Sequence, residues 1–156
     1  RGPRAPARRS AVVRRSGVPR RPDALLDTSA AVALVVADHD AHDATWDALH
    51  ARELGLAGHA WFETFSVLTR LPGAARRDAS TVERLISTNF PHSRFLDEGS
   101  TSALTSELAR LGVSGGAVYD ALVAAAAARH SLPLVSRDRR AVETYRAFGV
   151  EVELLD

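Results

Sequence analysis

The sequence predicts an α/β protein in which helices cover both faces of a parallel sheet. Two patterns support this prediction. Short, nearly continuous apolar runs recur along the chain, as expected of strands that are buried on both sides. These runs alternate with longer segments of helical periodicity, which is the order of elements in parallel α/β sheets. At 156 residues, 46% of them hydrophobic, the chain is long enough to form one domain with a packed core.

Five short segments are predicted strands. Each is an apolar run bounded by polar or turn residues, and the first, ALL, stops at Asp27. The fourth, in LPLVSRD, leads to Asp138. In chain order, the predicted strands are residues 24–26, 54–58, 95–96, 132–135 and 150–155.

Seven segments are predicted helices, and several have recognisable ends. Thr28 or Ser29 is available as the N-cap of the first helix. Pro72 ends the third helix, and Ser80 and Glu83 have the spacing of a capping box at the start of the fourth. In chain order, the predicted helices are residues 30–36, 44–52, 60–71, 79–89, 102–111, 116–130 and 139–148.

Charge divides the chain into two parts. Residues 1–22 contain eight Arg and no acidic residue, a net charge of +8, whereas residues 23–156 contain twelve Arg and nineteen Asp or Glu, a net charge of −7. We therefore predict a disordered Arg/Pro-rich extension over residues 1–22, most simply a dispensable one, and a folded domain over residues 23–156. A nucleic-acid-binding arm, a transit peptide and a translation start placed too far upstream are alternatives for the extension. Its four prolines argue against the helix that a transit peptide forms.

Composition excludes several classes of protein. The chain has no cysteine, which excludes disulfides, thiolate catalysis and Cys-ligated zinc and is consistent with a cytoplasmic location. No apolar run reaches the roughly 18–20 residues that a membrane-spanning helix needs, so we expect no membrane partner.

Four acidic residues stand in apolar or small-residue surroundings, where a charge is costly. Asp27 and Asp138 follow predicted strands, and Glu63 and Asp120 interrupt the apolar parts of predicted helices. A buried carboxylate usually has a cation, hydrogen-bond donors or a metal ion as its partner. Taken singly, each acid could equally be a helix cap or a charge that favours the helix dipole.

The predicted topology brings these four acids together. In a parallel sheet, the carboxyl ends of the strands and the N-termini of the helices that follow meet at one edge, where ligands bind. Close carboxylates repel one another, and one or two divalent cations would relieve the repulsion. Oxygen ligands without His or Cys favour Mg²⁺ or Mn²⁺, which can activate a water for attack on a phosphodiester.

The segments LLDTSA, WFETFSVLTRLP, YDALVAAAA and LVSRDRR, in this order, resemble the motifs of PIN-domain ribonucleases, specifically the VapC-type toxins of bacterial toxin–antitoxin pairs. The resemblance spans residues 24–155 and does not include the basic extension. It implies a three-layer α/β/α fold around a central, mostly parallel five-stranded sheet. It also implies an acidic Mg²⁺ or Mn²⁺ site that hydrolyses RNA, a homodimer, and inhibition by a small cognate antitoxin.

The resemblance also implies roles for individual residues. Asp27, Glu63, Asp120 and Asp138 correspond to the four acids of the family pattern and are the expected catalytic and metal-binding residues. Asp27 and Asp120 would be the most direct ligands. The hydroxyls of Thr28 and Ser136 would hydrogen-bond the ligand carboxylates.

The negative charge of the domain also indicates how RNA would be bound. Because a domain of net charge −7 is an unusual partner for a polyanion, the substrate must be held locally by arginines. Arg137, Arg139 and Arg140, beside Asp138, are the candidate RNA contacts.

Other motifs were weighed against this site. The run DHDAHD, residues 38–43, is expected to be an exposed connection rather than a metal site, and Asp97 a surface residue or an accessory to the site. We expect the aromatic side chains to belong to the core or to a dimer interface rather than to stack on bases; they are Trp46, Trp61, Phe62, Phe65 and Tyr119.

The leading functional prediction is therefore a Mg²⁺- or Mn²⁺-dependent endoribonuclease toxin. The alternative is a catalytically inactive PIN-like module that binds RNA or a protein partner. A third possibility, another Mg²⁺ enzyme such as a phosphatase or a receiver-like domain, fits less well because a receiver needs a lysine and the chain has none. For a metal site we expect Asp27→Asn and Asp120→Asn to leave the stability of the metal-free protein unchanged or higher, because repulsion falls.

Overall fold

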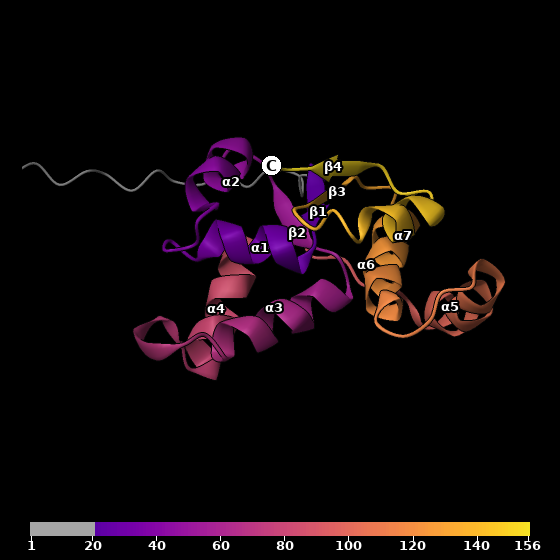
Figure 1. Ribbon diagram of the computed structural model, residues 1–156, viewed down its shortest axis with the longest axis horizontal. Helices are drawn as coiled ribbons and strands as arrows, with labels where there is room; N and C mark the ends of the chain where they lie inside the picture. The colour runs from indigo at the N-terminus through magenta and orange to yellow at the C-terminus, as the bar shows by residue number, and fades with distance from the viewer. Residues whose placement is uncertain (1–20) are drawn as a thin grey trace, which may run out of the picture.

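The structure, a computed structural model, describes residues 21–156 and is built around a sheet of four parallel strands (Figure 1). The order of the strands in the sheet is β2-β1-β3-β4, so the first strand lies at the centre. Leu25 pairs with Gly55 on one side and with Leu134 on the other. The strands are β1 (Ala24–Leu26), β2 (Leu54–Leu56), β3 (Leu134–Ser136) and β4 (Val152–Leu154).

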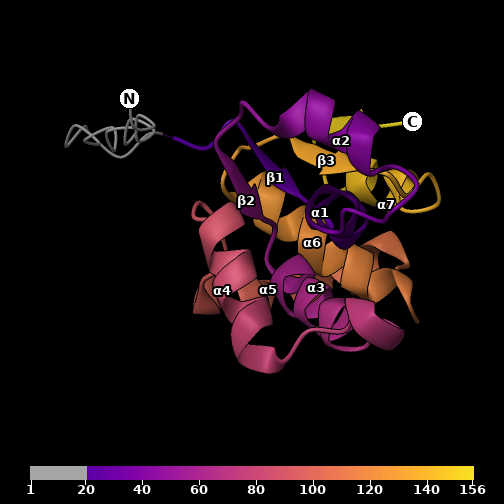
Figure 2. The same cartoon turned by 90° about the vertical axis from the view of Figure 1, so that its left-hand side faces the viewer.

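In residues 21–156, helices cover both faces of the sheet, as Figures 1 and 2 show. One face carries α1 (Thr28–Val35), α2 (His42–Leu49), α3 (His59–Thr69) and α4 (Ala79–Asn89). The other carries α6 (Ala117–Arg129) and α7 (Val142–Ala147), and α5 (Glu98–Leu111) packs on the outside of α6. A short 3₁₀ turn, Gly73–Ala75, precedes α4. The predicted α/β fold, with a parallel sheet between two layers of helices, is confirmed.

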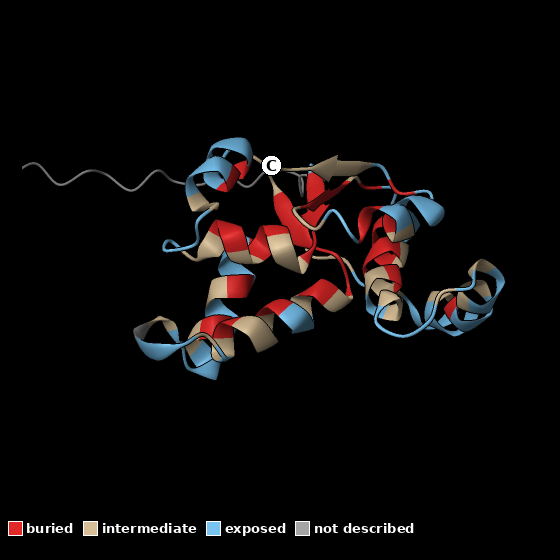
Figure 3. Ribbon diagram, in the orientation of Figure 1, coloured by how far each residue is buried: buried red, intermediate tan, exposed pale blue. Residues whose placement is uncertain are grey.

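The alternation of side chains along β1 divides the core in two. Ala24 and Leu26 point into a cluster formed with α1, α3 and α4, whereas Leu25 points into a cluster formed with α6 and α7. All three side chains are fully buried, and Figure 3 shows buried residues on β1, β2 and β3 and on the helices beside them, whereas the edge strand β4 is half-buried. A continuous apolar run is therefore needed for a strand with helices on both sides.

The sheet has one strand fewer than predicted. Within residues 21–156, the predicted fifth strand at residues 95–96 is replaced by a single parallel bridge between Ala57 and Arg94. The segment follows the outer edge of β2, but the hydroxyl of Ser93 accepts the hydrogen bond of the Leu56 amide at 2.9 Å. Because a side chain takes the place of a backbone carbonyl there, a regular ladder does not form.

Three helices begin with an aspartate at the N-cap. The carboxylate of Asp27 accepts from the amide of Ala30, so Asp27 caps α1 in place of the predicted Thr28 or Ser29. Asp78 caps α4 in the same way, so the predicted Ser80–Glu83 capping box is wrong. Asp97 caps α5. A carboxylate directly before a helix interacts favourably with the helix dipole as well as with the amide.

Most of the predicted extension, residues 1–22, lies outside the described residues. The structure describes only its last two residues, of which Pro22 is buried. Arg21 donates from Nη2 to the carbonyl of Ser131 at 2.7 Å. In the described part of the chain, none of the helices is both long and apolar enough to span a bilayer.

Gly55 is predicted to be essential for stability, because β2 passes close to the segment that follows α4. A Cβ atom at Gly55 would lie 2.2 Å from the carbonyl oxygen of His92. We expect Gly55→Ala to lower the free energy of unfolding by about 2 kcal/mol or more, measured by urea denaturation. Gly99→Ala is the matched control, since a Cβ there meets only ordinary van der Waals contact. Equal unfolding midpoints for the two variants would contradict the prediction.

Candidate active site

The four acids predicted from the sequence line one pocket of about 170 Å³. They come from four separate parts of the chain: Asp27 from the end of β1, Glu63 from α3, Asp120 from the first turn of α6, and Asp138 from the connection between β3 and α7. The remaining lining residues are Thr28, Ser29, Val123 and Tyr145. The edge of a parallel sheet thus collects the four carboxylates, as the topology predicts.

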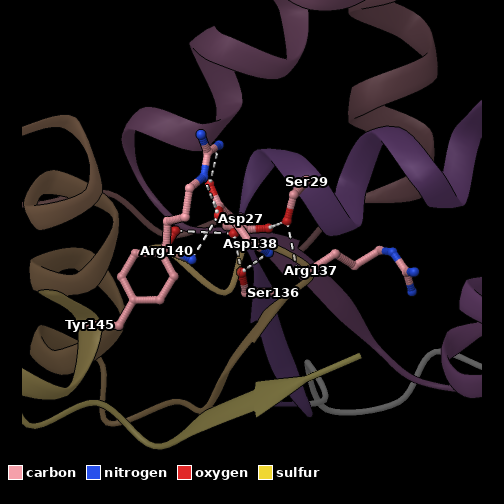
Figure 4. A network of polar contacts seen from close by, with 7 residues as sticks. All are labelled: Asp27, Ser29, Ser136, Arg137, Asp138, Arg140 and Tyr145. Atoms are coloured by element: carbon pink, nitrogen blue, oxygen red, sulfur yellow. Dashed lines mark hydrogen bonds and ion pairs between the residues drawn. The ribbon is translucent and has the colours of Figure 1, made fainter. Parts of the chain in front are cut away.

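Asp27 is the most buried of the four, with 3% of its surface exposed. Its Oδ1 accepts from the Ser29 hydroxyl at 2.7 Å and from the Ala30 amide at 3.0 Å. Its Oδ2 accepts from the Ser136 hydroxyl and, at 3.0 Å, from the Tyr145 hydroxyl. Burial raises the pKa of this carboxyl, and the four hydrogen bonds act in the opposite direction. Hydrogen bonds to both carboxylate oxygens therefore fix the position of the Asp27 side chain (Figure 4).

Two serine hydroxyls connect the loop after β3 to the start of α1. Ser136 donates to Asp27 and accepts from the amide of Asp138 at 3.0 Å. Ser29 donates to Asp27 and accepts from the amide of Arg137 at 2.8 Å. The backbone amide of Asp138 is therefore linked to the Asp27 carboxylate through the Ser136 hydroxyl (Figure 4).

Tyr145, on α7, belongs to the site although the sequence gave no reason to select it. Its ring is buried, and burial together with the negative charge of Asp27 raises the pKa of its hydroxyl. The hydroxyl therefore keeps its proton and acts as a donor to Asp27. A tyrosine on the buried side of a short helix is ordinarily a core residue. The one signal in the sequence that could have selected Tyr145 is that a buried tyrosine hydroxyl generally needs a hydrogen-bond partner.

Asp120 and Glu63 line the same pocket and have fewer hydrogen bonds than Asp27. Burial raises the pKa of Asp120, and the negative charges of Asp138, Glu63 and Asp27 raise it further. Within residues 21–156, the Asp120 carboxylate accepts no hydrogen bond. Glu63 is exposed and accepts from the Thr28 hydroxyl at 2.8 Å. Thr28 and Ser136 thus each hydrogen-bond one of the four carboxylates.

The three candidate arginines have different partners. Arg140 donates to Asp138 through Nε at 3.1 Å, and this pairing lowers the pKa of the Asp138 carboxyl. Arg137 extends to the Thr45 hydroxyl on α2 at 3.4 Å, and Arg139 pairs with Asp156. Arg137 and Arg140 line an adjoining pocket of about 400 Å³, and Arg139 does not. That pocket is also lined by Thr28, Ser29, Val32, His39 and Asp138.

The donor set of the acidic pocket fits a divalent cation. The pocket offers four carboxylates, and besides burial the negative charges of the other three raise the pKa of Asp120. Hard cations such as Mg²⁺ and Mn²⁺ take oxygen ligands of this kind. Across residues 21–156, no three His, Asp or Glu side chains already form a closed ligand cluster. A bound ion would therefore draw the carboxylates closer than they lie here.

Asp97 and the run at residues 38–43 do not line the acidic pocket. Residues 36–41 connect α1 and α2, and residues 38–43 are exposed or half-buried, with His42 and Asp43 already in α2. Asp97 accepts from the Ser100 amide and pairs with Arg129 at 3.1 Å. These bonds lower the pKa of Asp97 to about 2 and give it a structural role.

Comparison with known proteins places the chain in a family. The sequence matches the PIN domain over residues 24–147. It is 45% identical to Ribonuclease VapC27 of Mycobacterium tuberculosis over 132 residues, which cover 85% of this chain and 96% of that protein. It is 44% identical to Ribonuclease VapC40 of the same species over 131 residues, with coverage of 83% and 96%.

A solved structure has the same fold at lower sequence identity. A chain in the structure of FitAB bound to an IR36 DNA fragment superposes with a TM-score of 0.56 and 20% identity, covering 83% of this chain and 93% of that one. At this identity the likeness concerns the fold alone. The family match and the identity to the two ribonucleases show that the chain belongs to the PIN-domain family, as a member of its VapC group.

Proposed function

We propose that this protein is a Mg²⁺- or Mn²⁺-dependent endoribonuclease that hydrolyses RNA phosphodiester bonds and acts as the toxin of a toxin–antitoxin pair. One observation carries the proposal: carboxylates from four separate chain segments line a single pocket. A protein that only binds a partner has no need to keep four mutually repelling acids together. The identity of 44–45% to two proteins named as ribonucleases supports the choice of RNA as substrate.

The residues of the pocket would have different roles in catalysis. Asp27 and Asp120 are the proposed main metal ligands, with Glu63 and Asp138 completing the set. A divalent ion held there would supply the positive charge that favours ionisation of an attacking water and stabilises the phosphoryl group in the transition state. Asp27 is held in place by its four donors, and Thr28 orients Glu63. Such positioning limits the reorganisation that the reaction needs.

The adjoining pocket offers a place for the phosphates of the substrate. Arg137 and Arg140 line it, and it shares Thr28, Ser29 and Asp138 with the acidic pocket. These two arginines are the proposed phosphate contacts in a domain that is otherwise negative. Arg139 is the weaker of the three candidates, because its guanidinium is paired with Asp156 outside this pocket.

The proposal extends to partners and location. As for VapC-type toxins in general, we propose a small cognate antitoxin as inhibitor, a homodimer as the working form, and the cytoplasm as the site of action. A catalytically inactive PIN-like module that binds RNA or a protein is the alternative, and the same four residues distinguish the two. Only the enzyme requires all of them to be carboxylates.

The first test is cleavage of purified tRNA and rRNA by the full chain with Mg²⁺ or Mn²⁺. We expect discrete cuts that disappear in EDTA and return when the metal is restored. Growth arrest on expression of the chain, relieved by its cognate antitoxin, would support the role as a toxin. Binding of RNA without cutting, with either ion and over a range of pH, would favour the inactive module.

A further inference from the structure

Exposed aromatic side chains lie directly beside the acidic pocket. Tyr119, at the start of α6, is 55% exposed, and Phe62 on α3 is 59% exposed. The ring of Tyr119 stacks on that of His59, with 5.0 Å between centroids and 22° between planes. The sequence predicted these aromatic residues to be structural or to lie in an interface, and in this structure both are exposed.

These side chains line a groove of about 580 Å³ that shares two of its lining residues with the acidic pocket. Glu63 and Asp120 line both cavities. One face of α3 and the start of α6 form the groove, and Arg70 stands at its far end with Nε donating to the Ser66 carbonyl. We call it the aromatic groove; its lining residues are His59, Phe62, Glu63, Ser66, Arg70, Gly116, Tyr119 and Asp120.

The groove combines aromatic rings with the two carboxylates that it shares with the acidic pocket. A flat base has two apolar faces, and aromatic side chains stack on them without dependence on net charge. The phosphate that the ribose joins to such a base would lie toward the shared carboxylates. The apolar side chains of a second protein would instead bury Glu63, Asp120 and Arg70 against a nonpolar surface, which is unfavourable.

We propose that the aromatic groove binds, by stacking on Tyr119 and His59, the base next to the scissile phosphate of a single-stranded RNA. This inference rests on the proposed ribonuclease function. It assigns Tyr119, His59 and Phe62 as residues that determine where the enzyme cuts, since an unpaired base is required at that position. Paired RNA, whose bases are already stacked on one another, is excluded from the groove.

The test is an abasic scan of a short single-stranded RNA that the wild-type protein binds. One base at a time is removed, and both the KM of cleavage and the Kd in EDTA are measured. Loss of the stacked base is expected to raise KM and Kd by roughly five- to a hundredfold at one position. Tyr119→Ala is expected to raise them by a similar factor on intact RNA. It should add no further loss with the abasic RNA at that position, since the two changes remove the same contact.

Two control variants make the result specific. Tyr119→Phe keeps the ring, so it should retain most of the binding that Tyr119→Ala loses. Trp46→Ala removes another aromatic side chain, on α2, which is 49% exposed, stacks on His50 and lies outside the lining of both pockets. It should leave KM and Kd unchanged.

Each failure has its own signature. If the wild-type protein cuts RNA but no abasic position matters and Tyr119→Ala behaves as wild type, the inference is wrong and the proposed function stands. If nothing is cut but one abasic position weakens binding only when Tyr119 is present, the groove is a base site and the nuclease proposal fails. If light scattering shows that Tyr119→Ala dissociates an oligomer, the groove is an interface between copies and the inference is overturned.

Discussion

Asp120→Asn is expected to abolish RNA cleavage while leaving the metal-free protein as stable as the wild type or more stable. The expected loss of activity is at least about a hundredfold, since the variant removes a charge that acts directly on the reaction. Stability should not fall, because the carboxylate of Asp120 accepts no hydrogen bond within residues 21–156 and is repelled by three neighbouring acids. Cleavage assays and urea unfolding in EDTA measure the two effects separately.

The difference in stability between wild type and Asp120→Asn should depend on pH in a defined direction. The pKa of Asp120 is raised in the folded protein, so between its unfolded and folded pKa values the folded state binds more protons. The contribution of Asp120 to the free energy of unfolding therefore falls as pH rises from its unfolded to its folded pKa. The advantage of the Asn variant should be larger at pH 7 than at pH 4. A variant that is less stable than wild type by more than about 2 kcal/mol would show that Asp120 has a structural partner.

Asp27→Ala is expected to give the opposite result, a loss of about 3 kcal/mol or more in the free energy of unfolding. Four donors lose their acceptor, among them the fully buried Ser136 hydroxyl and the amide that begins α1. Each buried donor left without a partner costs about 1–3 kcal/mol, and loss of an N-cap about 1 kcal/mol. Relief of the desolvation that raises the pKa of Asp27 offsets only part of this.

The matched comparison is between the variants at Asp27 and those at Asp120. From the sequence, Asp27→Asn and Asp120→Asn were expected to behave alike, but the structure separates them. Asp27→Asn keeps one accepting oxygen and places an amide N–H₂ group against donors, so its stability should fall between those of wild type and Asp27→Ala. Urea denaturation at pH 7 in EDTA ranks the variants. Equal stability of Asp27→Ala and Asp120→Asn would contradict the structural role assigned to the Asp27 network.

The part of the site that follows from strand order could be predicted from the sequence. Asp27 and Asp138 end apolar runs, and in a parallel sheet such positions share an edge with the starts of the helices that carry Glu63 and Asp120. Only the alternation of strands and helices along the chain is needed to place these four acids together. For the same reason the two layers of helices were predictable.

The rest of the site, and the number of strands in the sheet, depend on contacts between residues far apart in the chain. Tyr145 reaches Asp27 across 118 residues, whereas the contact of Ser136 across 109 residues was expected only from the resemblance to the family. No local pattern encodes such a hydrogen bond. The missing fifth strand has a similar origin, because it was decided by one hydroxyl, that of Ser93, bonding to the edge of β2. Propensity alone cannot anticipate a side chain that replaces a backbone partner.

The two aspartates at the strand ends should respond differently to ionic strength. Asp27 is fixed by buried neutral donors, which dissolved ions barely affect. Asp138 is held chiefly by Arg140, whose side chain is 92% exposed, and such pairs are screened within about 10 Å at 0.1 M salt. Added salt, or the phosphates of a polyanion, would loosen Asp138 and Arg140 without disturbing Asp27. The pocket thus combines one carboxylate with a permanent position and one that can adjust to what binds.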